Sequence, residues 1–117
     1  MWTTLHDLVA QCPVIVDRSK GNPHPRFPEY VYPLDYGYLQ GTTLGEGHCI
    51  DVWCGRNGLR VVTGLFCMLD PFKKDAEIEI LLGVNDDELL ELTSFLELTS
   101  FYVNQPQAAL YVPWFGR

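Results

Sequence analysis

The apolar residues of this chain occur in short runs that glycine, proline and asparagine interrupt, and this pattern restricts the fold to short strands. The runs are found at Cys12–Asp17, Ile50–Cys54, Leu59–Leu69, Ala76–Leu82 and Ala108–Val112. Asn57-Gly58 is typical of a two-residue hairpin turn, so the runs before and after it are expected to pair as antiparallel neighbours. Gly64 predicts a bulge or bend inside the second of these two runs.

One stretch carries the start signals of a long helix, which is expected to run from Asp86 to about Phe101. Asn85 is a favourable N-cap and Glu88 completes a capping box, while acidic residues fill the first turn, where the helix dipole favours them. The helix contains two copies of a hexapeptide, interpreted as a local duplication: Leu90–Phe95 and Leu96–Phe101. The first ten residues are compatible with a short helix or an irregular arm. Many short strands and one late helix predict a small, mostly antiparallel β-barrel with the helix packed against it.

Length and composition indicate one globular domain that spans residues 1–117. The chain has 117 residues, is 47% hydrophobic and carries a formal net charge of -7. This charge argues against nucleic acid or an anionic membrane as the main partner. No apolar run is long enough to span a bilayer, and no secretory signal is visible at the N-terminus. Four cysteines without a C-x-x-C pair are expected to be reduced thiols of a cytoplasmic protein.

Acidic residues are expected to converge at one end of the barrel. If the Asn57-Gly58 hairpin forms, the start of one strand, with Asp51, meets the end of its partner, with Asp70. The same rim then holds Glu46, His48 and Asp75. Two like charges about 4 Å apart repel by roughly 4 kcal/mol at an effective dielectric near 20, so a divalent cation would relieve the repulsion. The alternative is that these residues belong to solvated turns.

Four tyrosines lie within nine residues, in the stretch from Tyr30 to Tyr38. Alternate residues of an extended chain share a face, so some of the hydroxyls can point together. Tyrosine hydroxyls can bind phosphate oxygens or orient water without adding charge. Aromatic packing in the barrel is the other interpretation.

Three motifs resemble those of the soluble, Mg²⁺-dependent inorganic pyrophosphatases with an OB-like barrel. Tyr32–Tyr38 resembles the family's Y-P-x-N-Y-G-Y segment, Gly45–Val52 lies where the family has a D-x-D-x-x-D metal motif, and Asp70–Ala76 resembles its D-x-x-x-x-D-A block. Val14–Asp17 also resembles the family's V-I-V-E strand. The resemblance covers about Val14 to Leu82 and implies a short, divergent member of mainly β (α+β) fold, with an OB-like antiparallel barrel and one helix in the C-terminal half.

The resemblance implies roles for individual residues. The residues that match metal ligands for Mg²⁺, with Mn²⁺ as an alternative, are Glu46, Asp51, Asp70, Asp75 and, at an outer site, Asp17. The implied catalytic residues are Asp51, His48 and Tyr36, and the implied substrate-binding residues are Lys20, Arg26 and Tyr36. The implied reaction is hydrolysis of inorganic pyrophosphate to phosphate by a metal-activated water. The family commonly assembles, and Trp53, Trp114 and Phe115 are expected to contribute exposed aromatic surface to a homo-oligomer.

The chain departs from the family pattern mainly on the phosphate side. His48 stands in place of the middle aspartate, which binds and activates the attacking water, and Glu77 stands in place of a phosphate-binding lysine. These departures keep a second function open, a catalytically weak or inactive barrel that binds a metal-phosphate ligand or a protein partner. A zinc site at His48, Cys49 and Cys54 is a weaker third hypothesis, because the spacing is irregular.

Overall fold

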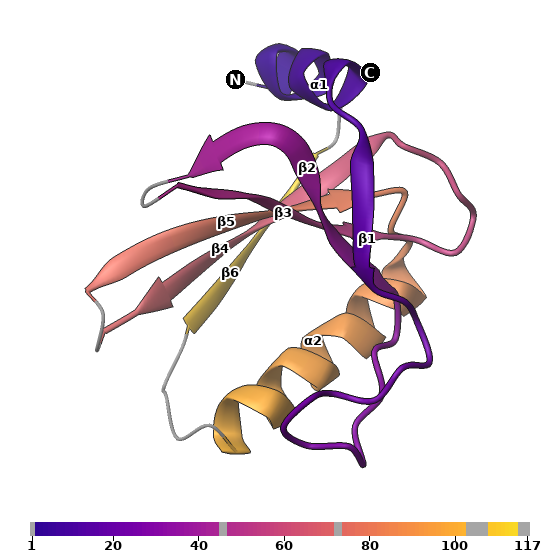
Figure 1. Ribbon diagram of the computed structural model, residues 1–117, viewed down its shortest axis with the longest axis vertical. Helices are drawn as coiled ribbons and strands as arrows, with labels where there is room; N and C mark the ends of the chain where they lie inside the picture. The colour runs from indigo at the N-terminus through magenta and orange to yellow at the C-terminus, as the bar shows by residue number, and fades with distance from the viewer. Residues whose placement is uncertain (1, 45–46, 72–73, 103–107, 115–117) are drawn as a thin grey trace.

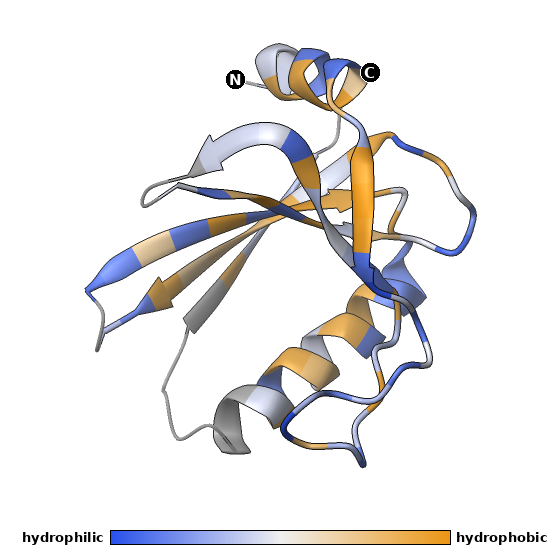
Figure 2. Cartoon of the chain, viewed as in Figure 1, coloured by the Kyte–Doolittle hydropathy of each residue, from blue (hydrophilic) through white to orange (hydrophobic). Residues whose placement is uncertain are grey.

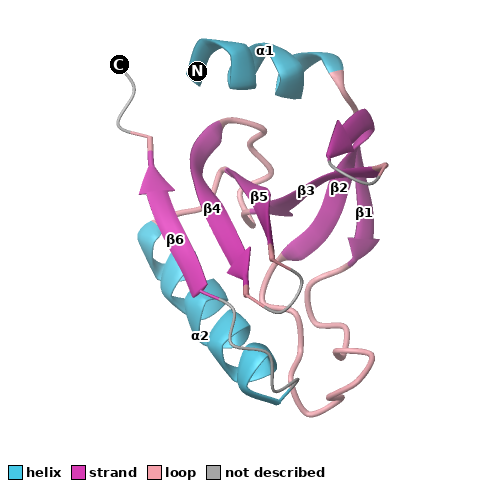
Figure 3. Cartoon of the chain, turned by 90° about the vertical axis from the view of Figure 1, so that its left-hand side faces the viewer, coloured by secondary structure: helices cyan, strands magenta, loops and turns pink. Residues whose placement is uncertain are grey.

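The computed structural model describes residues 2–44, 47–71, 74–102 and 108–114, which form one sheet with a helix on each side (Figures 1 and 3). The helices are α1 (Trp2–Gln11) and α2 (Asp86–Tyr102). The strands are β1 (Val14–Arg18), β2 (Asp35–Leu44), β3 (His48–Cys54), β4 (Val62–Asp70), β5 (Asp75–Leu82) and β6 (Ala108–Pro113). The prediction of a mainly β fold is confirmed, and the ambiguous N-terminal segment is a helix. Within the described residues no helix is long and apolar enough to cross a membrane.

The six strands form an open sheet in the order β1-β2-β3-β5-β4-β6. All neighbouring pairs are antiparallel except β3 and β5, which are parallel. The predicted hairpin between β3 and β4 is therefore wrong, because β5 lies between these two strands. The Asn57-Gly58 turn itself is present, since Gly58 has a positive φ of 74° and its N–H donates to the Gly55 carbonyl. After this turn the chain continues through an exposed loop, residues 59–61, before β4 begins.

Two apolar clusters hold the layers together, one on each face of the sheet. On the α1 side, Val9 of the helix packs with buried strand residues that include Leu39, Val52, Leu65 and Ile80. On the α2 side, Leu92 and Phe95 of the helix pack with aromatic and aliphatic residues: Tyr32, Leu34, Trp53, Phe66, Met68 and Leu81. Both faces of the central strands are therefore covered over part of their length, so a polar residue on them can be enclosed.

Local sequence signals account for the position of α2. The Glu88 N–H donates to Asn85 Oδ1 over 2.8 Å, and the Asn85 N–H donates to Glu88 Oε1 over 3.0 Å. This reciprocal pair is the predicted capping box, and it begins the helix at Asp86. The predicted irregularity at Gly64 is also confirmed, because the register of β4 against β5 shifts between Val62 and Gly64.

Candidate functional site

Acidic side chains line the α2 face of three neighbouring strands. In the register of the sheet, Asp51 of β3 lies beside Glu79 of β5, and Asp75 of β5 lies opposite Asp70 of β4. Directly paired residues point to the same face, and so do alternate residues of one strand. Asp75, Glu77 and Glu79 therefore follow one another along the same face of β5, and Figure 2 shows the alternation of hydropathy along this strand. We refer to Asp51, Asp70, Asp75, Glu77 and Glu79 as the acidic face.

Aromatic residues hold two carboxylates of the acidic face. The Tyr36 hydroxyl donates a hydrogen bond to Asp51 Oδ2 over 2.7 Å, and Trp53 Nε1–H donates to Glu79 Oε1 over 2.9 Å. The rings of Tyr36 and Trp53 pack together with their centroids 4.5 Å apart. The register explains this arrangement, because Tyr36 pairs with Trp53 across β2 and β3. Both carboxylates therefore have fixed orientations.

Burial disfavours the charged forms of these groups. Burial is the main cause that raises the pKa of Glu79 to about 7, the Trp53 hydrogen bond opposes the shift, and Asp51 and Glu77 add to it. Burial also raises the pKa of Asp51, against the Tyr36 hydrogen bond and the nearby His48. The pKa of the Tyr36 hydroxyl is raised by burial first and then by Glu79 and Asp51, so Tyr36 remains a donor.

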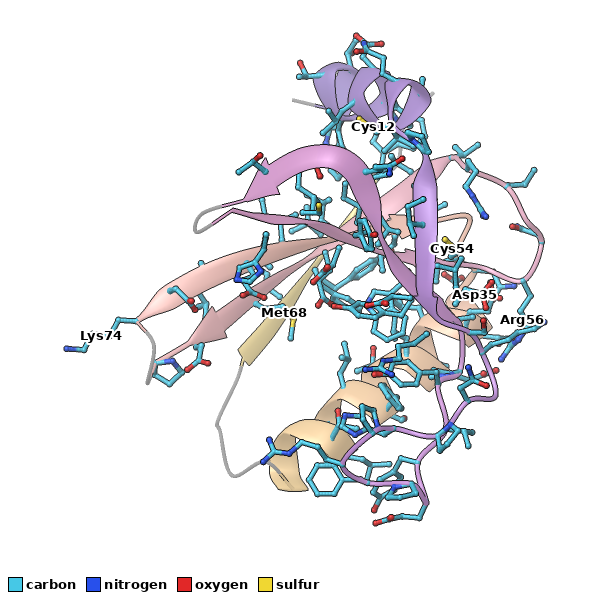
Figure 4. The ribbon with its side chains drawn as sticks, in the orientation of Figure 1. Cys12, Asp35, Cys54, Arg56, Met68 and Lys74 are labelled. Carbon is cyan, nitrogen blue, oxygen red and sulfur yellow. The ribbon has the colours of Figure 1, made fainter. Side chains whose placement is uncertain are left out.

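Asp70 and Asp75 form a second acidic pair at the far end of the face. They lie four residues along β5 from the level of Asp51 and Glu79, which corresponds to ~13 Å at about 3.3 Å per residue. The expectation that Asp51 and Asp70 meet at one rim depends on the hairpin and is wrong, because the two residues share a face of the sheet but not an end. Lys74, at the tip of the β4–β5 turn, projects away from the molecule (Figure 4). It therefore does not neutralise the acidic face.

The other predicted residues have varied positions. His48 is exposed at the start of β3 and close enough to lower the pKa of Asp51. Asp17 is exposed in β1, at the irregularity beside Arg18, and raises the pKa of Asp51. The backbone N–H of Lys20 donates to Asp35 Oδ1 over 2.8 Å, whereas Arg26 is exposed in the segment between β1 and β2. Glu46 lies outside the described residues.

The donor chemistry of the acidic face fits a hard divalent cation. Within the described residues, no group of three or more His, Cys, Asp or Glu side chains is arranged to hold a metal ion. Asp51 and Glu79 nevertheless present two carboxylates from adjacent strands to one face, and neither makes an ion pair in the described part of the chain. Mg²⁺ retains several waters and is commonly bound by one or two carboxylates together with substrate phosphates. The donor atoms of this pair are therefore of the type that Mg²⁺ prefers.

Sequence reasoning missed the part that Glu79 and Trp53 play here. The sequence predicts Ala76–Leu82 only as a strand, and it predicts that Trp53 contributes exposed aromatic surface to an interface. Trp53 is only 2% exposed, so that assignment is wrong. Phe115 lies outside the described residues, and Trp114 packs its ring against His6. The signal in the sequence is the alternation of acidic and apolar residues along Asp75–Leu82. It places Glu79 on one face of the strand, and α2 covers that face.

The fold is that of known inorganic pyrophosphatases. The chain is similar to the inorganic pyrophosphatase of Thermus thermophilus, with a TM-score of 0.61 and 15% identity over 86% of this chain and 80% of that one. It is also similar to the inorganic pyrophosphatase of Coxiella burnetii, with a TM-score of 0.57 and 16% identity over 86% and 83% of the two chains. Neither protein-family models nor curated proteins gave a match to the sequence. At sequence identities of 15% and 16%, the similarity to these two proteins concerns the fold alone.

Proposed function

We propose that this protein hydrolyses inorganic pyrophosphate to phosphate with the help of a divalent cation. The observation that carries the proposal is a face of carboxylates, with Asp51 bonded to a tyrosine hydroxyl, in a fold that resembles inorganic pyrophosphatases. Asp51, Asp70 and Asp75 are also the residues whose positions match the metal ligands in the motif resemblance. Two independent features, fold and motif, thus support one function.

The proposed metal ligands are carboxylates of the acidic face, together with Asp17 and Glu46. Mg²⁺ is the proposed ion, and Mn²⁺ is the alternative, since both prefer oxygen donors. When bound, the ion would supply positive charge to the phosphate oxygens and lower the pKa of a water molecule. Tyr36 has a positioning role in this proposal, because its hydroxyl fixes the orientation of the Asp51 carboxylate.

His48 and Asp51 are the proposed groups that orient the attacking water and take its proton. His48 is exposed at the start of β3, and its charge is close enough to Asp51 to lower the pKa of that carboxyl group. A neutral imidazole can accept a proton, although it is a poorer ligand for Mg²⁺ than a carboxylate. Lys20, Arg26 and the Tyr36 hydroxyl are the proposed contacts to the substrate.

The second candidate is a catalytically weak or inactive protein that binds a metal-phosphate ligand or a protein partner. Glu77 favours it, because it places a negative charge where the resemblance implies a phosphate-binding lysine. The buried Glu79 adds another carboxyl group to the same face. Both candidates use the acidic face, and they differ in whether phosphate is released.

Release of phosphate from pyrophosphate, measured with millimolar Mg²⁺ and then with Mn²⁺, tests the proposal. We expect activity that depends on the metal and is abolished by Asp70→Asn. Asp87→Asn is the matched control, because Asp87 is an exposed acid in the first turn of α2. Absence of phosphate release with either ion would favour the binding protein. A rise in thermal stability with Mg²⁺ that Asp70→Asn removes would then still indicate a metal site.

The proposal also concerns location and assembly. We place the protein in the cytoplasm, because its cysteines are free in the structure and thiols persist in reducing compartments. We also infer a homo-oligomer, in which copies of the chain meet through exposed apolar residues of the sheet such as Leu110. The acidic charge balance makes nucleic acid and anionic membranes unsuitable partners.

A further inference from the structure

The proline-rich segment between β1 and β2 is an ordered arm rather than an irregular connection. Gly21 N–H donates to the Tyr32 carbonyl over 2.8 Å, Tyr32 N–H donates to the Asn22 carbonyl over 2.9 Å, and His24 N–H donates to the Tyr30 carbonyl over 2.8 Å. Pro23 and Val31 form an isolated antiparallel bridge. The segment therefore folds back on itself, and we call residues 19–32 the arm. Its side chains have defined positions relative to the sheet.

His24 is locked in one orientation within the arm. Its Nδ1 accepts hydrogen bonds from the backbone N–H groups of Arg26, over 3.1 Å, and Phe27, over 3.3 Å. The neutral ring must then carry its proton on Nε2. The ring is stacked parallel to that of Tyr32, with centroids 6.0 Å apart and planes 6° apart. Nε2–H is thus a hydrogen-bond donor whose direction the backbone and the stacking define.

Two arginines flank this histidine. Arg18 pairs with Tyr36 in the register of β1 and β2, and its charge is close enough to Tyr32 to lower the pKa of that hydroxyl against the effect of burial. Burial is the main cause that lowers the pKa of His24, and the nearby charges of Arg18 and Arg26 lower it further. In the described part of the chain, both ion pairs belong to Arg56, so neither Arg18 nor Arg26 has a carboxylate partner. Asp17, the neighbour of Arg18 in β1, is close enough to Tyr32 to raise the pKa of its hydroxyl.

The arm and the acidic face lie on either side of two stacked tyrosines. The rings of Tyr32 and Tyr36 are 6.1 Å apart between centroids and inclined by 24°. The charge of Arg18 acts on the Tyr32 hydroxyl, while the Tyr36 hydroxyl donates a hydrogen bond to Asp51. Positive charge is thus concentrated beside the acidic face in a protein whose net charge is -7. An anion bound at the arm would therefore lie next to a cation bound at the acidic face.

We propose that Arg18, Arg26 and the Nε2–H of His24 bind a phosphoryl or phosphonate oxyanion of the ligand. This inference rests on the proposed function, and it assigns two residues, Arg18 and His24, that the motif resemblance does not. Guanidinium groups recognise such oxyanions through paired N–H donors, and an imidazole N–H supplies a further donor. Arg18 of β1 and Arg26 of the arm provide the positive charge that position 77 lacks.

Calorimetric titration with methylenediphosphonate, which is not hydrolysed, tests the site without turnover. It is carried out first with EDTA and then with Mg²⁺, and inorganic phosphate is a second probe. We expect Arg18→Gln to weaken diphosphonate binding at least tenfold. Arg18→Lys should weaken it less, because lysine keeps the positive charge but lacks the paired N–H donors of the guanidinium group. Arg60→Gln is the matched control, since Arg60 is an equally exposed arginine of the β3–β4 loop. We expect it to change binding less than twofold.

Two results would overturn the proposal. One is equal weakening by Arg18→Gln and Arg60→Gln, which would mean that only the overall charge matters. The other is no binding of either probe by the wild-type protein at millimolar concentration. Thermal unfolding verifies that each variant is folded. If Arg18→Gln does not fold, Arg18→Lys replaces it in the comparison with Arg60→Gln.

The same variants separate this proposal from the proposed function. Binding that depends on Arg18, without phosphate release from pyrophosphate, would support the site and contradict hydrolysis. Hydrolysis whose KM is unchanged by Arg18→Gln would support the enzyme and contradict the site. His24→Gln provides a second arm of the test, because it removes the Nε2–H donor without changing the charge of the neutral ring. We expect a loss of threefold or more in diphosphonate affinity.

Discussion

Glu79 is a carboxyl group enclosed by an indole, a tyrosine and other carboxylates, and its ionisation is coupled to folding. Its native pKa is about 7, against an ordinary value of 4.5. Between these two pH values the native state binds more protons than the unfolded state, so the free energy of unfolding falls as pH rises. This loss in the free energy of unfolding is complete above pH 7 and absent below about pH 4.5. The free energy lost is about 1 to 3 kcal/mol.

Glu79→Gln should remove this pH dependence. We expect the variant to match the wild type in urea denaturation at pH 4.5 and to be more stable by about 1 to 3 kcal/mol at pH 8, both with EDTA. Glu77→Gln is the control, because Glu77 lies two residues away on the same face but is exposed. An identical pH slope for wild type and Glu79→Gln would contradict the assignment.

His48 is the residue at which catalysis and binding are most easily told apart. If the protein is an enzyme, His48→Asp should raise Mg²⁺-dependent phosphate release at least several-fold, because a carboxylate is a harder ligand and a suitable proton acceptor. Steady-state rates of phosphate release, compared for the two proteins under the same conditions, provide the measurement. No gain in the variant would indicate that the missing lysines limit turnover.

At the scale of elements, Glu88 joins α2 to the β3–β4 loop. Its side chain is buried, and it accepts hydrogen bonds from the backbone N–H groups of Asn85 and Arg56, the latter over 2.7 Å. The Arg56 guanidinium also reaches Glu91 and the carbonyl of Pro33. Gly55 permits this approach, because a Cβ there would lie 1.9 Å from the Gly83 carbonyl oxygen. The loop and the helix start are thus one hydrogen-bonded unit.

Glu88→Ala should be far more costly than an ordinary helix substitution. It leaves two partly buried backbone N–H groups without their acceptor, so we expect a loss of about 1 to 3 kcal/mol in urea unfolding. Glu97→Ala, an exposed change in the same helix, should stay within about 0.5 kcal/mol. The stability loss of Glu88→Gln should lie between those of Glu88→Ala and Glu97→Ala, since an amide keeps one acceptor oxygen. Equal stability of Glu88→Ala and Glu97→Ala would refute the role of the cap.

The duplicated hexapeptide shows why a repeat in sequence is not a repeat in packing. Six residues are about 1.7 helical turns, so the second copy faces another direction. Leu92 is fully buried, whereas its counterpart Leu98 is 43% exposed. Each copy does keep one local feature, because Thr93 and Thr99 both donate their hydroxyl to the carbonyl four residues earlier. The interpretation as a local duplication without its own architecture agrees with this packing.

Elements whose signals are local were predictable, whereas long-range pairings were not. The cap at Asn85 and the bulge at Gly64 depend on neighbours in sequence, and both are found. The Asn57-Gly58 turn is also real, but a turn does not determine which strands pair after it. The parallel alignment of β3 with β5 joins residues 28 positions apart, such as Asp51 and Glu79, and no local pattern encodes it. This pairing places Glu79 in the candidate site, which is why sequence reasoning did not find it.

At the scale of the whole molecule, charge is divided between the two faces of the sheet. The carboxylates of β3, β4 and β5 point to the α2 side, and on the α1 side the described residues of β3, β4, β5 and β6 include no Asp, Glu, Lys or Arg. Part of the α1 side is uncovered. Cys67 pairs there with Ile78 and Leu110, and the exposed fractions are 39% for Ile78, 63% for Leu110 and 53% for Leu69. We call these four residues the Cys67 patch.

The Cys67 patch is where we expect two copies of the chain to meet. Copies with a net charge of -7 repel one another least where they present no carboxylates, and identical apolar rows can pack face to face as sheets do. Leu110→Glu should therefore reduce the mass measured by light scattering at micromolar concentration. Leu90→Glu is the matched control, because Leu90 is 69% exposed on α2 and outside the patch, and it should leave the mass unchanged. A monomeric wild type would contradict the homo-oligomer, and equal masses for the two variants would exclude this surface as the contact.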